Sequence, residues 1–240
     1  MTKLLFRDDA YLRDAAAKVL AITDEGGIVL DQTVFYPTSG GQPGDSGHLT
    51  WDGGRIEIAT AVKGPHDSVV LVPSEPSALP KVGAQVSQRI SWERRHRLMR
   101  VHTALHLLSV VIPLPVSGGS IAVDKGRLDF DMPEAPDDKS VIEDTLNKLI
   151  ACHFDVTDEW ITDADLDAQP DLVKTMSVQP PRGSGQIRLV RIGAGDNTAD
   201  LQPCGGTHVA NTSEIGRIRI GKIEKKGKQN RRVYLHLVDA

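Results

Sequence analysis

Two pairs of metal-binding side chains stand out in this sequence. His102 and His106 lie in HTALHLL, and Cys204 and His208 lie in PCGGTH, so each pair has the spacing i, i+4. On a helix that spacing is about one turn, which lets the imidazoles of the first pair point to the same side. If the two pairs meet in space, they offer three histidine nitrogens and one thiolate. Zinc prefers this combination of ligands.

The neighbouring residues restrict the chemistry of such a site. The zinc proteases with two helical histidines need a glutamate directly after the first one, but that position is Thr103. Neither pair has the Cys-x-x-Cys spacing of a common zinc finger. Phosphoryl transfer would need carboxylate ligands for magnesium, which the four residues lack. A single histidine is usually a packed or surface residue, but a second pair in a Gly-Gly turn favours a metal site.

The segments that precede the first pair are predicted to be strands. β-branched-rich runs at 18–22 and 27–35, and shorter runs at 48–51, 55–62, 68–72 and 85–90, are separated by turn sequences such as DEGG and KGPHD. Short strands at regular spacing are typical of a small antiparallel barrel. We therefore predict an all-β domain with a glycine-rich loop over residues 1–90.

The rest of the chain mixes helices with strands. Apolar residues at spacings of three and four predict a helix over 93–112 that carries His102 and His106 and ends at Pro113. We expect two strands around a Lys-Gly turn in 117–132, a helix over 137–153, strands over 154–161 and 186–192, and a terminal hairpin. The predicted fold class is α+β, with a zinc-binding domain over 91–240 after the barrel.

Composition excludes several other classes of protein. The chain has 240 residues, only two cysteines, and no apolar run close to the length that a membrane span needs. The first residues contain no hydrophobic core of a signal peptide. We therefore expect a reduced, cytoplasmic protein without a disulfide framework and without a membrane partner.

Positive charge is concentrated in two places. The net charge is −4, but residues 215–240 contain eight Lys and Arg against two acidic residues. A second basic run, RRHR at 94–97, comes just before the histidine pair. Either run alone could be an ordinary solvated face. Because the two runs flank the expected metal site, together they favour a polyanionic ligand.

A glycine-rich segment, FYPTSGGQPGD, follows one of the expected strands. Gly40 and Gly41 would let backbone N–H groups approach a ligand closely, and the Gln42 amide is both a donor and an acceptor. The alternative is a plain turn between two strands.

The three motifs FYPTSGGQPGD, HTALHLL and CGGTH, taken in that order, resemble the editing domain of alanyl-tRNA synthetases and its free-standing relatives, the AlaX-type alanyl-tRNA editing proteins. The similarity runs over about residues 27–237 and includes RHRLMRVH, GRLDF and RRVYL. The lack of an aminoacylation or anticodon-binding region points to the free-standing, medium-length type. The resemblance implies ATP-independent hydrolysis of the ester that joins serine or glycine to the tRNA for alanine.

The resemblance also implies roles for individual residues. His102, His106, Cys204 and His208 become the zinc ligands through which catalysis occurs, Gly40, Gly41 and Gln42 belong to the loop at the aminoacyl pocket, and Ser120 lines that pocket. An editing site must accept serine and spare alanine, so we expect Gln42, Thr103 or Ser120 near the side-chain hydroxyl of the substrate. The chain departs from many synthetase editing domains at Leu105, where they carry a hydroxyl. The cationic side chains expected to hold the acceptor end of the tRNA are Arg94, Arg95, Arg97, Lys225, Lys226 and Arg231.

Two other functions fit the same residues. One is a zinc-stabilised RNA-binding module without hydrolytic activity, because four protein ligands are typical of a closed structural site. The other is a metallohydrolase for a small ester or amide, which leaves the basic runs unexplained.

Overall fold

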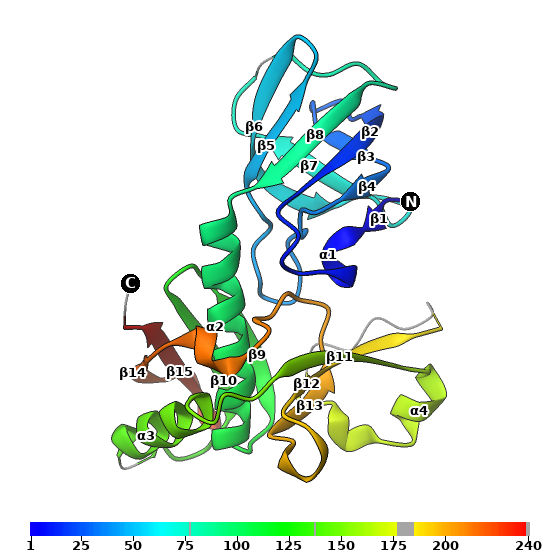
Figure 1. The fold of residues 1–240 in the computed structure, drawn as a ribbon. Helices are drawn as coiled ribbons and strands as arrows, with labels where there is room; N and C mark the ends of the chain where they lie inside the picture. The colour runs from blue at the N-terminus through cyan, green and yellow to red at the C-terminus, as the bar shows by residue number, and fades with distance from the viewer. Residues whose placement is uncertain (77, 137, 177–184, 239–240) are drawn as a thin grey trace. The chain divides into compact units, whose positions relative to one another are not determined.

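The computed structural model describes residues 1–76, 78–136, 138–176 and 185–238. The chain forms two compact units, Met1–Arg97 and Leu98–Ala240 (Figure 1). The division falls inside helix α2 (Trp92–Val111), whereas the boundary expected from the sequence lies just before it. Among the described residues, no helix combines the length and the apolar character that a membrane span requires.

The first unit contains a closed antiparallel barrel with the strand order β2-β3-β7-β6-β5-β8. Its strands are β2 (Asp14–Ile22), β3 (Ile28–Leu30), β5 (Gly47–Trp51), β6 (Gly54–Lys63), β7 (Val69–Pro73) and β8 (Gln85–Ile90). A short parallel pair, β1 (Lys3–Leu4) with β4 (Gln32–Thr33), lies next to α1 (Leu5–Asp8) in the chain. The predicted antiparallel barrel is confirmed.

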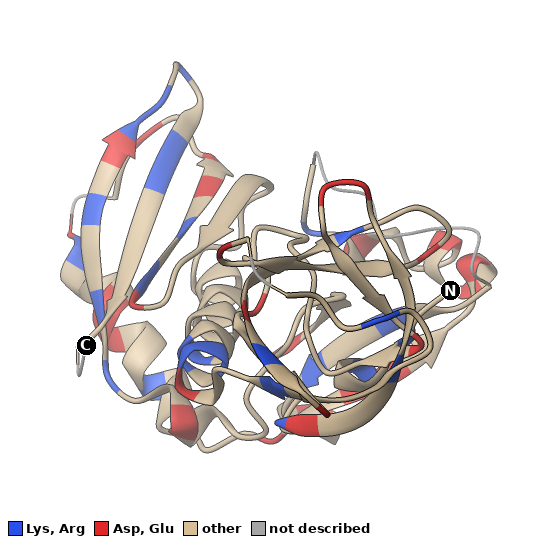
Figure 2. Cartoon of the chain, turned by 90° about the horizontal axis from the view of Figure 1, so that it is seen from above, with Lys and Arg blue, Asp and Glu red and all other residues tan. Residues whose placement is uncertain are grey.

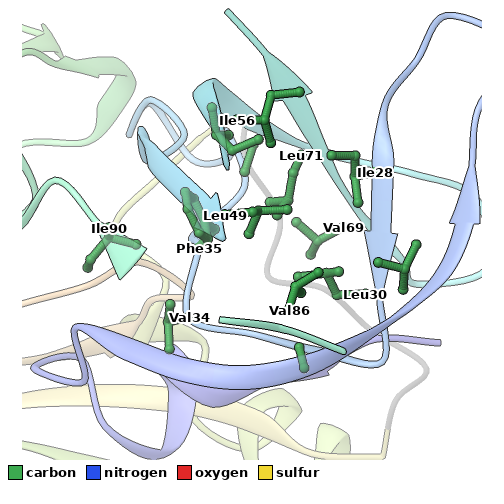
Figure 3. Packing of buried hydrophobic residues seen from close by; sticks show 14 residues of the cluster. Ile28, Leu30, Val34, Phe35, Leu49, Ile56, Val69, Leu71, Val86 and Ile90 are labelled. Carbon is green, nitrogen blue, oxygen red and sulfur yellow. The ribbon is translucent and has the colours of Figure 1, made fainter. Parts of the chain in front are cut away.

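Alternation along the strands produces the barrel core. In β8 every second side chain is buried, and the residues between them are exposed, as expected for a strand with one face in the core. Figure 3 shows Leu49, Leu71 and Val86 among the apolar side chains that gather inside the barrel. Burying one such side chain contributes about 1.5–3 kcal/mol, so this cluster is the main source of the unit's stability.

The strand expected over 27–35 is interrupted. β3 ends at Leu30 and β4 at Thr33, yet Val34 is fully buried. The side chain of Gln88, also fully buried, takes the place of a neighbouring strand there. Its Oε1 accepts hydrogen bonds from the Val34 N–H at 3.0 Å and the Thr33 hydroxyl at 2.9 Å, and its Nε2 donates to the Gln32 carbonyl at 3.0 Å. A side-chain amide thus satisfies backbone groups that would otherwise be buried without partners.

The second unit contains a four-stranded antiparallel sheet with the order β14-β15-β10-β9. The strands are β9 (Val116–Ile121), β10 (Lys125–Asp131), β14 (Ile218–Lys225) and β15 (Asn230–Leu237). The terminal hairpin is therefore formed by β14 and β15, as expected. The turn between β9 and β10 differs from the expectation, because Lys125 and Gly126 lie inside β10. The Ala122 N–H donates to the Lys125 carbonyl and closes the turn before them.

Helix α2 packs closely on one face of this sheet. A Cβ added at Gly126 would lie 2.7 Å from Val101 and 2.9 Å from Leu105, so the glycine makes room for the helix. Gly126, Leu128 and Phe130 alternate along β10 on this buried face. Because Val101 and Leu105 face the sheet, this contact fixes the rotation of α2 and therefore the side to which its histidines point.

Helix α3 (Lys139–Ile150) covers the outer edge of β14. Its Asn147 side chain donates to the Ile218 carbonyl and accepts from the Ile218 N–H, while Glu143 accepts from the Ile220 N–H. These bonds satisfy the edge of the sheet, where a strand would otherwise expose unpaired backbone groups. The helix begins after Asp138, whose side chain caps the Ser140 N–H.

A three-stranded antiparallel sheet with the order β11-β12-β13 completes the second unit. Its strands are β11 (Val156–Ile161), β12 (Ile187–Ile192) and β13 (Asp200–Pro203). One face of β12 packs Ile187 and Leu189 against Leu166 of α4 (Asp163–Asp167). Short 3₁₀ turns occupy Pro170–Leu172, Gly195–Asn197 and Thr212–Ile215. The sequence does not predict β13, because four residues that include a proline carry no periodic signal.

Candidate metal centre

The structure brings His102, His106, Cys204 and His208 together. One nitrogen or sulfur atom from each lies within 4.8 Å of the others. The first two residues project from neighbouring turns of α2, and the other two lie in the loop that follows β13. The Cys204 Sγ is 3.5 Å from the His102 Nε2 and 3.3 Å from the His208 Nε2. The two halves of the site are thus about 100 residues apart in the chain and adjacent in space.

The four donors suit a borderline-soft metal ion. The three histidines are at least nine-tenths buried, and Cys204 is half-buried. Burial raises the pKa of the Cys204 thiol, but its electrostatic interactions with the neighbouring imidazoles, His102 first, outweigh this and hold the pKa well below its usual value. Burial lowers the pKa of His208 well below its usual value. A thiolate and a neutral imidazole are the forms that bind metal ions.

Asp200 orients one of the histidines. Its carboxylate is fully buried and accepts a hydrogen bond from the His106 Nδ1 at 3.0 Å. It also accepts from the Gln202 amide at 2.7 Å and from the Lys174 ammonium. Because a carboxylate only accepts, His106 carries its proton on Nδ1 and presents Nε2 to the site. A carboxylate behind a metal-binding histidine fixes both the tautomer and the ring orientation.

Thr103 does the same for His208. Its hydroxyl has one proton, which it donates to the Met99 carbonyl at 3.0 Å. The His208 Nδ1, 3.1 Å away, must therefore donate to the hydroxyl oxygen and present Nε2 to the site. The Val209 N–H donates to the same oxygen at 3.3 Å. The structure thus places Thr103, expected near the substrate, fully buried behind His208 of the candidate metal site.

Arg188 of β12 holds the loop that carries Cys204. Its guanidinium donates to the carbonyls of Cys204 and Gly206, each at 2.9 Å, and forms an ion pair with Asp158 at 2.7 Å. The Gly206 N–H points at the Cys204 sulfur from 3.4 Å. These contacts hold the thiolate in place from its own loop. No motif in the sequence points to Arg188 or Asp200, although Asp200, Gln202 and Cys204 alternate as residues on one face of a strand do.

Asp200→Asn is expected to weaken metal binding by about 10- to 100-fold, the usual cost of removing an outer partner of a metal ligand. The asparagine amide has only one oxygen that can accept a hydrogen bond. The carboxylate has two, and it accepts from both His106 and Lys174. Competition with a chromogenic chelator measures the affinity. Asp196→Asn is the matched control, because Asp196 is exposed and outside the site. Equal affinities for the two variants would show that Asp200 does not support the centre.

The glycine-rich segment forms a tight turn in the first unit, whereas the four donors belong to the second. Ser39 and Gln42 exchange backbone hydrogen bonds, and Gly40 and Gly41 have φ of 55° and 81°, which favour glycine. The Gln42 side chain is fully buried. The Asp45 carboxylate anchors the segment by accepting from the Tyr36 N–H at 2.6 Å.

Ser120 lies on the other face of the four-stranded sheet from the one that meets α2. It pairs with Arg127, and paired residues of neighbouring strands point to the same face. Gly126, the neighbour of Arg127 in β10, lies on the opposite face, where it packs against α2. The register therefore does not bring Ser120 to the face where α2 carries its histidines.

The basic side chains separate into buried and exposed groups. Arg95 is fully buried, and its guanidinium bonds to Asp45 and to the carbonyls of Ala10 and Val34. Arg231 is mostly buried and bonds to backbone carbonyls, including that of Pro133. These two residues stabilise the interior and do not present a charge to a ligand. Arg94 is half-buried and donates to the Gly44 carbonyl, Arg97 is half-buried, and Lys225 and Lys226 are exposed.

The four-stranded sheet also carries less unpaired positive charge than its sequence suggests, because acidic side chains pair with several of its basic ones. Lys222 and Lys226 share Glu224, and Arg127 and Arg232 share Asp129. Figure 2 shows Lys and Arg interleaved with Asp and Glu on the sheet near the C-terminus. Glu224 and Asp129 each pair with two basic side chains, so the sheet keeps an excess of positive charge.

Family models and full-length relatives both relate this chain to alanyl-tRNA editing proteins or to tRNA synthetases. Residues 187–234 match the family described as threonyl and alanyl tRNA synthetase second additional domain, and residues 8–94 match class II tRNA synthetases (A). The alanyl-tRNA editing protein AlaX-M of Methanosarcina acetivorans is 36% identical over 249 residues, which cover 100% of both chains. The protein of the same name from Methanosarcina barkeri is 35% identical, again over 100% of both chains. The alanine–tRNA ligase of Pyrobaculum neutrophilum is 34% identical over 93% of this chain and 25% of the ligase.

Proposed function

This chain belongs to the AlaX-M family of alanyl-tRNA editing proteins, and from that premise we propose that it hydrolyses the ester of a mischarged tRNA for alanine. The substrate we propose is seryl-tRNA, with glycyl-tRNA as a second one. The observation that carries the proposal is the convergence of His102, His106, Cys204 and His208 in a chain of this family. The same donors are the basis for proposing a bound ion.

We propose zinc as that ion. Three imidazole nitrogens and one thiolate within 4.8 Å of one another match the ligand types that zinc takes in proteins. Among the described residues, no carboxylate joins the four donors as a ligand, which disfavours magnesium or calcium. Asp200 and Thr103 stand behind two of the ligands and hold them in the tautomer that a metal requires.

The residues of the chain prepare the site for ester hydrolysis. Bound zinc would supply Lewis-acid polarisation of the ester or of a water molecule. Asp200, Thr103 and Arg188 fix the ligands, so little reorganisation is needed when the substrate arrives. Cys204 is the least buried of the four ligands, and the neighbouring Gly205 is exposed. We propose that the ester approaches from this side.

Selectivity for serine requires a polar group near the substrate hydroxyl. The Thr103 hydroxyl already has three partners, and Ser120 lies on the other face of its sheet. We therefore propose Gln42, with Gly40 and Gly41, as the source of contacts to the aminoacyl group, on the strength of the family resemblance. For the tRNA backbone we propose Arg94, Arg97, Lys225 and Lys226, which are not fully buried. Such contacts weaken as salt concentration rises.

The proposal predicts that the zinc-loaded protein releases serine from seryl-tRNA for alanine, and that a chelator stops the reaction. Loss of radiolabelled serine from the tRNA measures the rate. A zinc-stabilised RNA-binding module would bind this tRNA and release no serine. A hydrolase for small esters would cleave serine methyl ester as well as it cleaves seryl-tRNA. Either of these two results would contradict the proposed function.

A further inference from the structure

A tryptophan lies in the same row of the three-stranded sheet as the metal-binding cysteine. Trp160 of β11 pairs with Arg188 of β12, and the Cys204 N–H donates to the Arg188 carbonyl at 3.1 Å. The three residues therefore form one row across the sheet. Paired residues on neighbouring strands point to the same face, so Trp160 shares the face of Arg188 and Cys204.

Several contacts confirm which face this is. Arg188 reaches Asp158 on one side and the Cys204 carbonyl on the other. Asp200, which alternates with Cys204 along the chain, contacts His106 of α2. The opposite face of the sheet packs its apolar residues against Leu166. Trp160 therefore belongs to the side of the sheet that carries the metal centre.

The Trp160 side chain is available to a ligand. Its residue is 48% exposed, although tryptophan is usually well buried. It lies on β11, an edge strand of the sheet. Its cross-strand neighbour Arg188 has only 8% of its side chain exposed and bonds to the loop and to Asp158. A single exposed apolar residue needs no explanation by itself, but its place in the row with Cys204 does.

The spacing fits the substrate of the proposed function. Two strand separations place Trp160 about 10 Å from Cys204 along the sheet. This is comparable to the span from an aminoacyl ester, across the ribose, to the base of the nucleotide that carries it. That nucleotide is the adenosine at the single-stranded CCA end of a tRNA. Proteins commonly bind unpaired bases by stacking them on aromatic rings.

We propose that Trp160 is the stacking platform for the terminal adenine of the tRNA when its ester lies at the metal centre. The inference rests on the proposed function, since it takes the ester to be the reacting group. Arg188 links the two ends of this subsite: the same side chain that holds the Cys204 loop lies between the thiolate and the indole. The tryptophan binds the nucleotide and does not take part in metal binding.

The first test is kinetic. Trp160→Ala is expected to lower kcat/KM for seryl-tRNA by roughly 5- to 100-fold, the usual range for removal of one base-stacking ring, mainly through KM. Bound zinc is expected to stay unchanged, and Trp160→Phe to recover most of the activity. Val141→Ala, at another exposed apolar residue, is the control. Wild-type kcat/KM in Trp160→Ala would overturn the proposal, as would equal losses in the alanine and phenylalanine variants.

A second test does not depend on hydrolysis. Binding is measured for two uncharged RNA hairpins with the acceptor-stem sequence, one ending in CCA and one ending in CC. The wild-type protein is expected to prefer the CCA hairpin, and Trp160→Ala to bind both equally. Equal binding of the hairpins by the wild type, or the same preference in both proteins, would overturn the stacking role. If the preference is found but no ester is cleaved, the proposed function fails and the adenine site remains.

Discussion

Replacing Cys204 by alanine is expected to reduce bound zinc from about one ion per chain to a small fraction of that value. Hydrolysis is expected to fall by more than about 100-fold, the upper end of the cost of changing a residue behind a ligand. The physical reason is that Cys204 is the only sulfur donor of the cluster and the only ligand that carries a negative charge. His106→Ala is expected to have the same effect on metal content.

Metal analysis of the purified variants, with thermal unfolding in the presence and absence of zinc, tests this prediction. An ion that binds only the folded chain raises its stability, so the wild type should melt at a higher temperature with zinc and the Cys204→Ala variant should not. Cys152→Ala is the matched control, because Cys152 is the other free cysteine, is exposed, and lies outside the cluster. Unchanged metal content in both Cys204→Ala and His106→Ala would refute the ligand assignment.

Replacing Asp45 by alanine is expected to destabilise the barrel unit by about 3–5 kcal/mol. Asp45 and Arg95 are almost completely buried, and the carboxylate accepts from the Arg95 Nε at 2.9 Å. Removal of the carboxylate leaves an uncompensated buried guanidinium and also takes the partner from the Tyr36 N–H. The glycine-rich segment between Tyr36 and Asp45 would lose its anchor at the same time.

Urea unfolding followed by far-ultraviolet circular dichroism measures this cost. Asp14→Ala is the control, because Asp14 forms its ion pair with Arg89 at the surface, where such a pair contributes at most about 1 kcal/mol. The double variant Asp45→Leu, Arg95→Met removes both charges and is expected to be less destabilised than Asp45→Ala. Equal stability of Asp45→Ala and Asp14→Ala would show that the buried pair does not hold the unit together.

Local patterns were sufficient to predict most of the barrel strands and the four side chains that the structure brings together as a candidate metal site. The i, i+4 spacing of His102 and His106 depends only on the helix period, and the barrel strands alternate over several residues. The predicted strand over 27–35 fails for a non-local reason. Gln88, more than 50 positions away, supplies the hydrogen bonds that end β4 early. No pattern within the segment itself shows this.

The residues behind the ligands could not be predicted from local patterns for the same reason. Asp200 acquires its role because β13 pairs with β12 and meets α2, and Arg188 because it lies beside the Cys204 loop. For Arg95 the local pattern predicts the wrong environment. Its place in the run RRHR predicts an exposed cation, but the first turn of α2 directs it to a buried carboxylate. Neighbours in the sequence do not reveal which charged side chain points inward.

The rates of serine and alanine release from the tRNA for alanine, measured with one zinc-loaded preparation, test the central claim most directly. The proposed editing function predicts that serine is released much faster than alanine, and that Cys204→Ala abolishes the release of serine. Equal rates for the two amino acids, or no release of serine from a protein with its full complement of zinc, would contradict it.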